Sequence, residues 1–291
     1  MTVHYDTLIL GHISKDIIVT PEAEEHLIGG AVVYSSIASR RINANIMALT
    51  KLSRDDLSLL SVFEACDVPV VHCLSQQTTS IRNTYLTSDR ERRICEAVSV
   101  AAPFYLGDIP SDIKADLYYL GGLIEGEFSE DLIESLSQLG KVAVDAQGFL
   151  RVNENGRLVF RDWSAKKKYI PMLSYLKADA AEAEILTGTK DYDKAALILN
   201  DWGAEEVMVT QNSGVTVCVD GELTTSPFTS RNLTGRTGRG DTCFSAYCNW
   251  RKNHSPRESC RFAAALTSLK MEKPGPFSGT IDDVERAIQE R

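Results

Sequence analysis

The sequence predicts an α/β protein, with a mostly parallel sheet covered by helices on both faces and a small β lid. Short apolar or β-branched runs alternate along the chain with segments of helical periodicity, which is typical of such a sheet. Residues 70–100 interrupt the alternation with two strand-like runs around a polar turn, which indicates a separate hairpin. Hydrophobic residues make up 43% and charged residues 24% of the 291 residues, as in globular chains with a sizeable core.

The first half of the chain opens on a buried strand at residues 5–11 that ends in a glycine turn. Gly29 and Gly30 precede an Ala-, Ser- and Val-rich segment, residues 31–42, that we predict to be a helix. No G-x-G-x-x-G follows the first strand, which disfavours a dinucleotide-binding fold. Further elements are predicted as strands at 17–20 and 45–49, a helix at 55–65, and hairpin strands at 81–86 and 93–98 around the turn 88–91.

In the second half the alternation returns, and the last two helices carry the clearest start signals. Ser255 and Glu258 form a capping-box pattern around a first-turn proline, and Thr280 with Asp283 opens the final amphipathic helix in a similar way. Strands are predicted at 117–120, 142–144, 175–177, 207–210 and 215–219. Helices are predicted from Ser129 to about 139, at 180–186 and at 191–202.

Charge and cysteine usage exclude several classes of protein. The formal net charge of −9 argues against nucleic-acid and anionic-membrane surfaces, because both need basic patches. No apolar run approaches the roughly 20 residues of a membrane span, and the N-terminus lacks the features of a signal peptide. The seven cysteines form no C-x-x-C pair and the five histidines are scattered, so reduced thiols are expected rather than a metal centre. These features predict a cytoplasmic protein.

The segment Thr237-Gly238-Arg239-Gly240-Asp241 begins a stretch of helical periodicity. Its glycines let the backbone approach a ligand closely, and the unpaired first N–H groups of a helix favour anions such as phosphate. A carboxylate at Asp241 repels phosphate, which makes sense if it takes a proton from an attacking hydroxyl. From these residues alone, an ordinary turn followed by a favourable first-turn acid explains the segment equally well.

Other polar residues also stand where strands end or helices begin. In parallel sheets, ligands bind beyond the carboxyl ends of the strands, so these residues are expected to converge on one site. They are Asp16, Gly29, Gly30, Asp145, Asp179 and Asp241.

Several segments, in the same order along the chain, resemble the ribokinase/PfkB family of carbohydrate kinases. Residues 237–242 are similar to its C-terminal signature, usually written with Gly-Ala-Gly-Asp, and residues 179–188 to its Asn-x-x-Glu segment ending in Leu-Thr-Gly. Residues 11–16 resemble its first-strand turn, and the glycine pair at 29–30 the one before its first long helix. The resemblance implies a ribokinase-like, Rossmann-like fold in a single domain, 1–291, with a lid from about 14–28 and 75–100.

The resemblance also implies roles for individual residues. Asp241 would be the catalytic base, and the backbone of Gly238, Arg239 and Gly240 the anion hole. ATP is the implied donor and Mg²⁺ the implied metal, with Glu182 on the metal side, reached through water. The implied substrate-binding residues are Asp16, Gly29, Gly30, Tyr34, Gln147 and Arg151, and the implied nucleotide-binding residues are Asp179, Thr210 and Gly214.

Departures from the family pattern bear on the substrate. Tyr34 stands where ribokinases commonly carry a substrate-contacting Asn, which counts against ribose itself. Asp179 replaces the usual Asn, and the nucleotide turn at 209–214 lacks its first glycine and is one residue short. Arg239 replaces the common Ala, where its guanidinium adds positive charge near phosphate, faces solvent or pairs with an acid. Residues 145–151 resemble the inositol-kinase-like members, although structural roles fit Gln147 and Arg151 equally well.

The leading hypothesis is therefore an ATP- and Mg²⁺-dependent kinase of a small sugar or polyol, with inositol or nucleoside kinases as alternatives in the same family. A non-catalytic sugar- or nucleotide-binding regulatory protein on this fold, and a nicotinamide-dependent oxidoreductase, are the alternatives of other classes. The expected partner is a small molecule, and the strand edges of the lid favour pairing into a homodimer.

Overall fold

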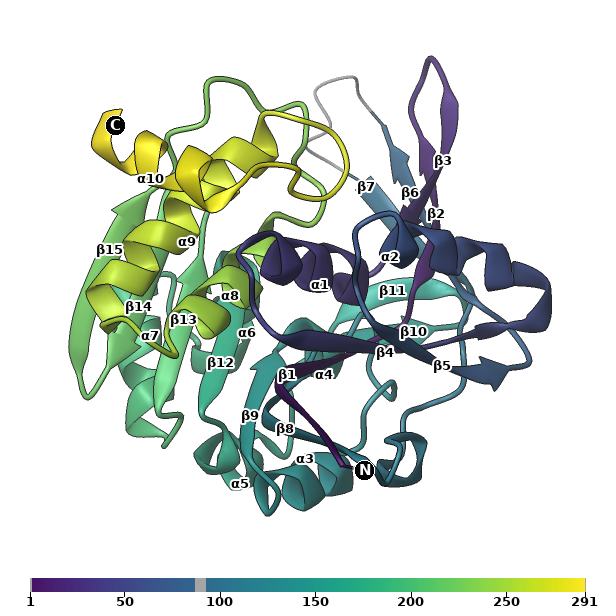
Figure 1. Cartoon of the computed structure of the whole chain (residues 1–291), viewed down its shortest axis with the longest axis horizontal. Coiled ribbons are helices and arrows are strands. Elements are labelled where there is room, and N and C mark those ends of the chain that lie inside the picture. The colour runs from purple at the N-terminus through teal and green to yellow at the C-terminus, as the bar shows by residue number, and fades with distance from the viewer. Residues whose placement is uncertain (1, 87–92, 291) are drawn as a thin grey trace.

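The computed structural model describes residues 2–86 and 93–290, and within them a nine-stranded sheet forms the centre of the molecule (Figure 1). Its strand order is β15-β14-β13-β12-β9-β8-β1-β4-β5. Neighbours from β13 to β5 run parallel, whereas β14 and β15 are antiparallel. The strands are β1 (Val3–Leu10), β4 (Ile46–Ser53), β5 (Val70–Ser75), β8 (Ile113–Leu120), β9 (Lys141–Asp145), β12 (Tyr175–Asp179), β13 (Glu206–Thr210), β14 (Gly214–Val219) and β15 (Glu222–Pro227).

Helices cover both faces of this sheet, which confirms the predicted α/β class. Successive side chains of a strand point to opposite faces, so Leu8 and Leu10 of β1 join one apolar cluster while Ile9 joins the other. The first cluster includes residues of α3 (Glu130–Ser137), α5 (Lys166–Tyr169), α6 (Ala180–Thr187) and α7 (Tyr192–Asp201). The second includes residues of α1 (Ala31–Arg41), α2 (Ser61–Glu64), α8 (Arg239–Trp250), α9 (Pro256–Met271) and α10 (Ile281–Glu290).

Local signals predicted most of these elements, although some of their bounds differ in the structure. The capping box of Ser255 and Glu258 is present at the start of α9. The strand expected at 45–49 continues to Ser53 because β5 pairs with its second half. The helix expected at 55–65 is instead the 3-10 helix η1 (Arg54–Leu60) followed by α2. The turn expected at 88–91 lies outside the described residues.

A smaller sheet, with six strands in the described residues, rises beside α1 in the order β10-β11-β7-β6-β2-β3 (Figure 1). The two segments expected to form a lid supply β2 (Ser14–Val19), β3 (Glu24–Gly29), β6 (Thr79–Tyr85) and β7 (Arg93–Ser99). The hairpin of β10 (Arg151–Glu154) and β11 (Arg157–Phe160) was not anticipated. It joins this sheet where Arg157 pairs with Glu96 of β7.

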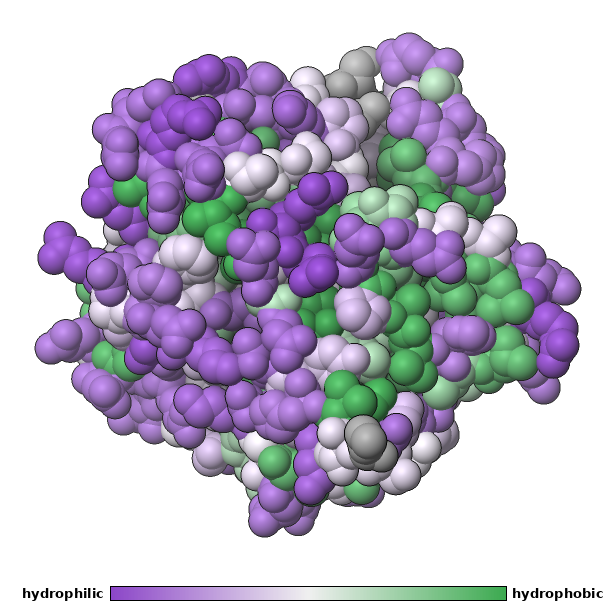
Figure 2. All heavy atoms as spheres, viewed as in Figure 1, coloured by the Kyte–Doolittle hydropathy of each residue, from purple (hydrophilic) through white to green (hydrophobic). Residues whose placement is uncertain are grey.

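The surface shown in Figure 2 is mostly hydrophilic, with hydrophobic residues showing over β4 and β5. The small sheet also exposes apolar side chains, among them Leu27, Ile94 and Val98. Pairing of two chains through this sheet therefore remains a prediction, for which these side chains would supply an apolar contact surface. Among the described helices, none has the length and apolar character that a membrane crossing requires.

Candidate active site

The turn that enters α8 presents free backbone amides. Gly238 caps the helix at φ +74°, a left-handed conformation that glycine adopts without strain. The N–H of Arg239 already donates to the carbonyl of Arg236 at 3.2 Å. In the described part of the chain, no acceptor is recorded for the N–H groups of Gly238, Gly240 and Asp241. These three amides are therefore available to bind an anion. At Arg239 only the side chain is available for this.

Asp241 lies in the first turn of α8. Its side chain is partly exposed on one side, while protein surrounds it closely on the others. The pKa of Asp241 is raised to about 6, mainly by burial and further by Asp145, against the opposing effect of the cations Lys177, Lys270 and Arg151. At neutral pH the carboxylate is thus ionised but basic enough to accept a proton, as a general base requires.

A buried lysine beneath this turn was missed by sequence reasoning. The ammonium of Lys177 lies 3.0 and 2.9 Å from the two carboxylate oxygens of Asp145, and 3.5 Å from Oε2 of Glu182. A Cβ on Gly240 would come within 3.2 Å of the same nitrogen. Burial opposes the charge on Lys177, but Asp145 and Glu182 outweigh it, so its pKa is raised. The available signal was a charged residue inside an otherwise apolar strand.

Asp179 and Glu182 are both engaged at the start of α6. Oδ1 of Asp179 accepts the N–H groups of Ala181 and Glu182 at 2.9 Å, and Oε2 of Glu182 accepts the N–H of Asp179 at 2.7 Å. Burial raises the pKa of Glu182 to about 8, although Lys177 opposes the shift. In the described residues, no group of three or more His, Cys, Asp or Glu side chains could hold a metal directly. Within the described part of the chain, each of the two carboxylates retains one oxygen without a recorded partner, which fits Mg²⁺ held mainly through water.

The glycine pair before α1 makes room for the carboxylate of Asp16. A Cβ on Gly29 would lie 2.2 Å from Oδ2 of Asp16, whose Oδ1 accepts a hydrogen bond from Ser14 Oγ at 2.8 Å. Gly30 has φ +103°, and a Cβ there would lie 2.2 Å from the carbonyl oxygen of His12. Glycine at both positions therefore lets the small sheet approach α1 closely.

Tyr34 of α1 is acted on by two acids that are far apart in the sequence. Its ring packs on Gly238, where a Cβ would lie 2.2 Å from two ring carbons. Burial raises the pKa of Tyr34, and the carboxylates of Asp16 and Asp241 raise it further. Because both carboxylates act on one phenol, the fold brings Asp16 and Asp241 to the same region.

The next two expected site residues are the first residue of the short helix α4 (Gln147–Leu150) and the residue that follows it. Nε2 of Gln147 donates to the carbonyl of Gly122 at 3.3 Å, and Nε of Arg151 donates to the carbonyl of Leu123 at 2.6 Å. Arg151 is buried and lowers the pKa of Asp241, so its charge acts at the same place. A structural contact accounts for Gln147, whereas Arg151 also contributes electrostatically to the site.

The turn between β13 and β14 is tight. The N–H of Gln211 donates to the carbonyl of Gly214 at 2.9 Å, and Thr210 is buried beside Asp179, its neighbour in register on β12. A Cβ on Gly214 would lie 2.5 Å from the carbonyl oxygen of Ser226. Close packing against β15 therefore explains this glycine without a nucleotide, while Thr210 lies at the strand ends near the site.

Two arginines converge beside residues 238–241, the candidate anion-binding turn. Nη1 of Arg239 donates to Oδ1 of Asn212 at 3.1 Å, and Nη2 of Arg236 approaches the same oxygen at 3.5 Å. The Arg239 guanidinium also lies 5.8 Å from the ring centroid of Phe228. Burial lowers the pKa of Arg239, and the nearby charge of Arg236 lowers it further. No ion pair to either arginine is recorded in the described residues, so the turn faces concentrated positive charge.

A buried acid connects the small sheet to the main one and was also missed. Glu127 accepts the N–H of His12 at 2.6 Å and the N–H of Leu123 at 2.8 Å. Nδ1 of His12 lies 2.9 Å from the hydroxyl of Thr79, which in turn accepts the N–H of Ala101 at 3.0 Å. The chain segments that enter and leave the small sheet are thereby fixed around one carboxylate.

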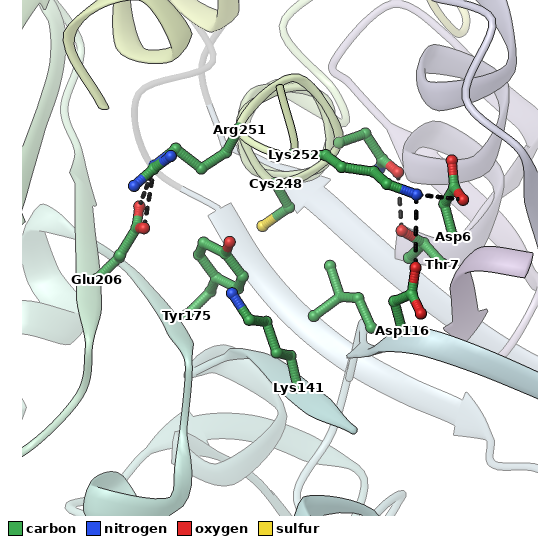
Figure 3. Close-up of a pocket in the computed structure, with 11 residues that line it drawn as sticks. Asp6, Thr7, Asp116, Lys141, Tyr175, Glu206, Cys248, Arg251 and Lys252 are labelled. Carbon is green, nitrogen blue, oxygen red and sulfur yellow. Dashed lines mark hydrogen bonds and ion pairs between the residues drawn. The ribbon is translucent and has the colours of Figure 1, made fainter. Parts of the chain in front are cut away.

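A cavity of about 290 Å³ lies at the opposite edge of the main sheet, under the end of α8 (Figure 3). Most of its charged side chains are paired with one another: Lys252 lies 2.6 Å from Asp6 and 3.4 Å from Asp116, and Arg251 lies 3.0 Å from Glu206. Lys141 lies over the ring of Tyr175 instead. Asp241, the two arginines and the amides for which the described residues offer no recorded acceptor all lie at or just before the start of α8 instead. We therefore take the start of α8, and not this cavity, as the candidate site.

Comparison with known proteins shows the family of this chain. The profile of the pfkB family carbohydrate kinases matches residues 7–282. A solved structure of a pyrophosphate-dependent kinase in the ribokinase family, complexed with a pyrophosphate analog and myo-inositol, is 40% identical with a TM-score of 0.88, over 96% of this chain and 99% of that one.

Two proteins of lower sequence identity are also similar to this chain. A cytidine kinase of Thermococcus kodakarensis is 23% identical over 95% of this chain and 99% of its own length. Ribokinase of Arabidopsis thaliana, complexed with ribose and ATP, is 17% identical with a TM-score of 0.77, over 99% of each chain. At that identity the likeness shows the fold alone, and it confirms the predicted ribokinase-like architecture.

Proposed function

The chain belongs to the pfkB family of carbohydrate kinases, and from this premise we propose that it transfers a phosphoryl group from pyrophosphate to a hydroxyl of a cyclic polyol of the myo-inositol type. The observation that carries the proposal is Asp241, a carboxylate with a pKa raised to about 6, located in a helix turn that has three amides without a recorded acceptor in the described residues. Asp241 would then act on the hydroxyl acceptor, while the amides would act on the phosphoryl donor of the same reaction.

The acceptor is proposed to lie between Asp16 and Asp241, against Tyr34. Asp16 would accept hydrogen bonds from substrate hydroxyls, and Asp241 would take the proton of the attacking hydroxyl as its oxygen bonds to phosphorus. The bond from phosphorus to the bridging oxygen breaks, and orthophosphate leaves. The same kind of polyol is bound by the relative that is 40% identical. A nucleoside acceptor is the alternative, favoured by the cytidine kinase match.

ATP was the donor implied by the sequence, and it remains the competing proposal. Two observations favour pyrophosphate. The relative at 40% identity is pyrophosphate-dependent. Arg236 and Arg239 place two guanidinium groups beside the amides, which suits a small donor whose charge is not shared with a nucleoside. Mg²⁺, bound through water by Asp179 and Glu182, would neutralise charge on the donor.

The direct test incubates the protein and Mg²⁺ with pyrophosphate or ATP and with myo-inositol, ribose or cytidine, followed by phosphorus NMR. We expect a new phosphomonoester and orthophosphate from pyrophosphate and myo-inositol. Turnover with ATP alone would overturn the proposed donor, and preference for cytidine would overturn the proposed acceptor. Stabilisation by polyols in a thermal-shift scan, with no product from any pair, would favour a non-catalytic binder.

The proposal that pyrophosphate is the donor can be tested separately at Arg236 and Arg239. Arg239→Ala should raise the KM for pyrophosphate at least about tenfold, since a lost charge-assisted contact is worth about 1.4 kcal/mol or more. Arg231→Ala is the matched control, because Arg231 is exposed in the same loop. Equal effects of the two substitutions would contradict a specific donor contact at Arg239.

A further inference from the structure

Lys270 of α9 is a buried lysine in an unusual setting. It is among the largest fully buried side chains, and in the described residues it has no ion-pair partner. Its ammonium instead donates hydrogen bonds to the carbonyl oxygens of Gly235 and Thr237, the residues just before the anion-binding turn. The ammonium nitrogen also lies 5.2 Å from the ring centroid of Tyr34. A buried charge without a carboxylate is costly, so such a group calls for an explanation.

The two hydrogen bonds act on the geometry of the anion-binding turn. In a planar trans peptide, the carbonyl and the N–H of the following residue point in opposite directions. Because the Thr237 carbonyl is held by Lys270, the N–H of Gly238 points away from the ammonium. Gly238 is the left-handed cap of α8, and its amide is one of the three without an acceptor. Lys270 therefore sets the orientation of the first donor of the turn.

The charge of Lys270 acts on the same place. Burial lowers the pKa of Lys270 to about 8, and the charged group that counteracts this shift is Asp241. In return Lys270 is one of the cations that lower the pKa of Asp241. At neutral pH the ammonium is mainly charged and lies behind the turn, where it adds to the field of the amides without occupying the ligand position.

We propose that Lys270 is a positioning residue of the donor site, which orients the Gly238 peptide toward the phosphoryl group and supplies buried positive charge behind it. The identity of the donor rests on the function proposed above, but the effect on anion binding does not. Sequence reasoning gave no indication of it, because Lys270 lies in a helix whose other buried residues are apolar or small.

The test replaces Lys270 by Met, which keeps an unbranched side chain and removes the charge and the donors. Calorimetry would measure the affinity for methylenediphosphonate, a non-hydrolysable pyrophosphate analogue, and separately for myo-inositol. We expect the diphosphonate affinity to fall at least about tenfold, as for a lost charge-assisted interaction, with the myo-inositol affinity changed less than about twofold. Lys273→Met is the control, because Lys273 is an exposed lysine nearby. Unchanged diphosphonate binding in Lys270→Met, or equal losses for both ligands, would overturn the proposal.

A second variant guards against misfolding. Lys270→Ala should regain diphosphonate affinity on addition of n-propylamine, which is charged at neutral pH, but not of 1-propanol, which is neutral. Failure of both variants to fold would assign Lys270 a structural role and overturn the proposal. If the wild type binds diphosphonate but transfers no phosphoryl group, the proposed function is wrong. The difference in diphosphonate affinity between wild type and the Lys270 variants still tests the role of Lys270. If it binds only the ATP analogue AMP-PNP, the same comparison is made with that ligand.

Discussion

Replacement of Asp241 by Asn is the most informative single perturbation of this site. The amide has nearly the same shape but cannot accept the hydroxyl proton. General-base catalysis contributes about 10²–10⁴-fold to such reactions, so kcat should fall within that range while the KM values change little. Because the pKa of Asp241 is raised to about 6, wild-type kcat/KM should fall as the pH decreases below about 6, and this limb should disappear in the variant.

The same substitution should increase stability. The pKa of Asp241 lies at about 6 in the folded chain and near 3.8 ordinarily, a difference of about 2 pH units that corresponds to up to about 3 kcal/mol. Solvent on the exposed side screens part of this, so we expect about 1–3 kcal/mol. Between these two pKa values, Asp241 is protonated in the folded state but ionised in the unfolded state. The destabilisation caused by its buried carboxylate is therefore complete above pH 6 and disappears below about pH 4.

The assay combines orthophosphate release, measured across pH, with urea unfolding at pH 7 and pH 4. Activity that stays within a factor of about ten of wild type would refute the assignment of a general base. A variant that loses both activity and stability at pH 7 would indicate a structural carboxylate instead. The expected combination, less activity with more stability, is typical of groups retained for function.

Three further substitutions test the parts around Asp241. Gly238→Ala should destabilise the fold by at least about 1–2 kcal/mol in urea unfolding, because alanine must adopt a left-handed φ and displace the Tyr34 ring; unchanged stability and turnover would contradict the packing described. Gly29→Ala should raise the KM for the polyol and leave that for the donor, because its Cβ displaces the Asp16 carboxylate; equal changes in both KM values would argue against Asp16 as an acceptor contact. Glu127→Gln should cost about 1–3 kcal/mol because one of two backbone N–H groups then meets an amide donor, and the exposed neighbour substitution Glu125→Gln should have almost no effect.

Much of the fold follows from local patterns. The alternation of apolar strands with helices, the capping box at Ser255 and the break in rhythm after residue 70 all arise from near-neighbour chemistry, so they are readable in a linear sequence. The hairpin of β10 and β11 was missed because its strands are short and only their pairing with β7 makes them part of the small sheet.

Some residues of the candidate site could likewise be selected from local sequence patterns, whereas others could not. Gly238, Gly240 and Asp241 could be selected from sequence because the anion-binding property of a helix start is local. Lys177, Glu127 and Lys270 were not selected, because each also acts through partners that are distant along the chain. For Lys177 the main partner is Asp145, and for Lys270 it is the backbone of residues 235–237.

The sequence by itself thus determined the fold class, the family and the turn where phosphate chemistry is expected. Only the tertiary structure decided which charges surround that turn and that Asp16 and Asp241 both act on the phenol of Tyr34. It also decided that two arginines share Asn212 beside the turn, with no ion pair to either recorded in the described residues. The physical reason is that pKa values and electrostatic fields depend on burial and on distances through space. Those distances are set by the packing of α1, α8 and α9 against the sheet and not by position along the chain.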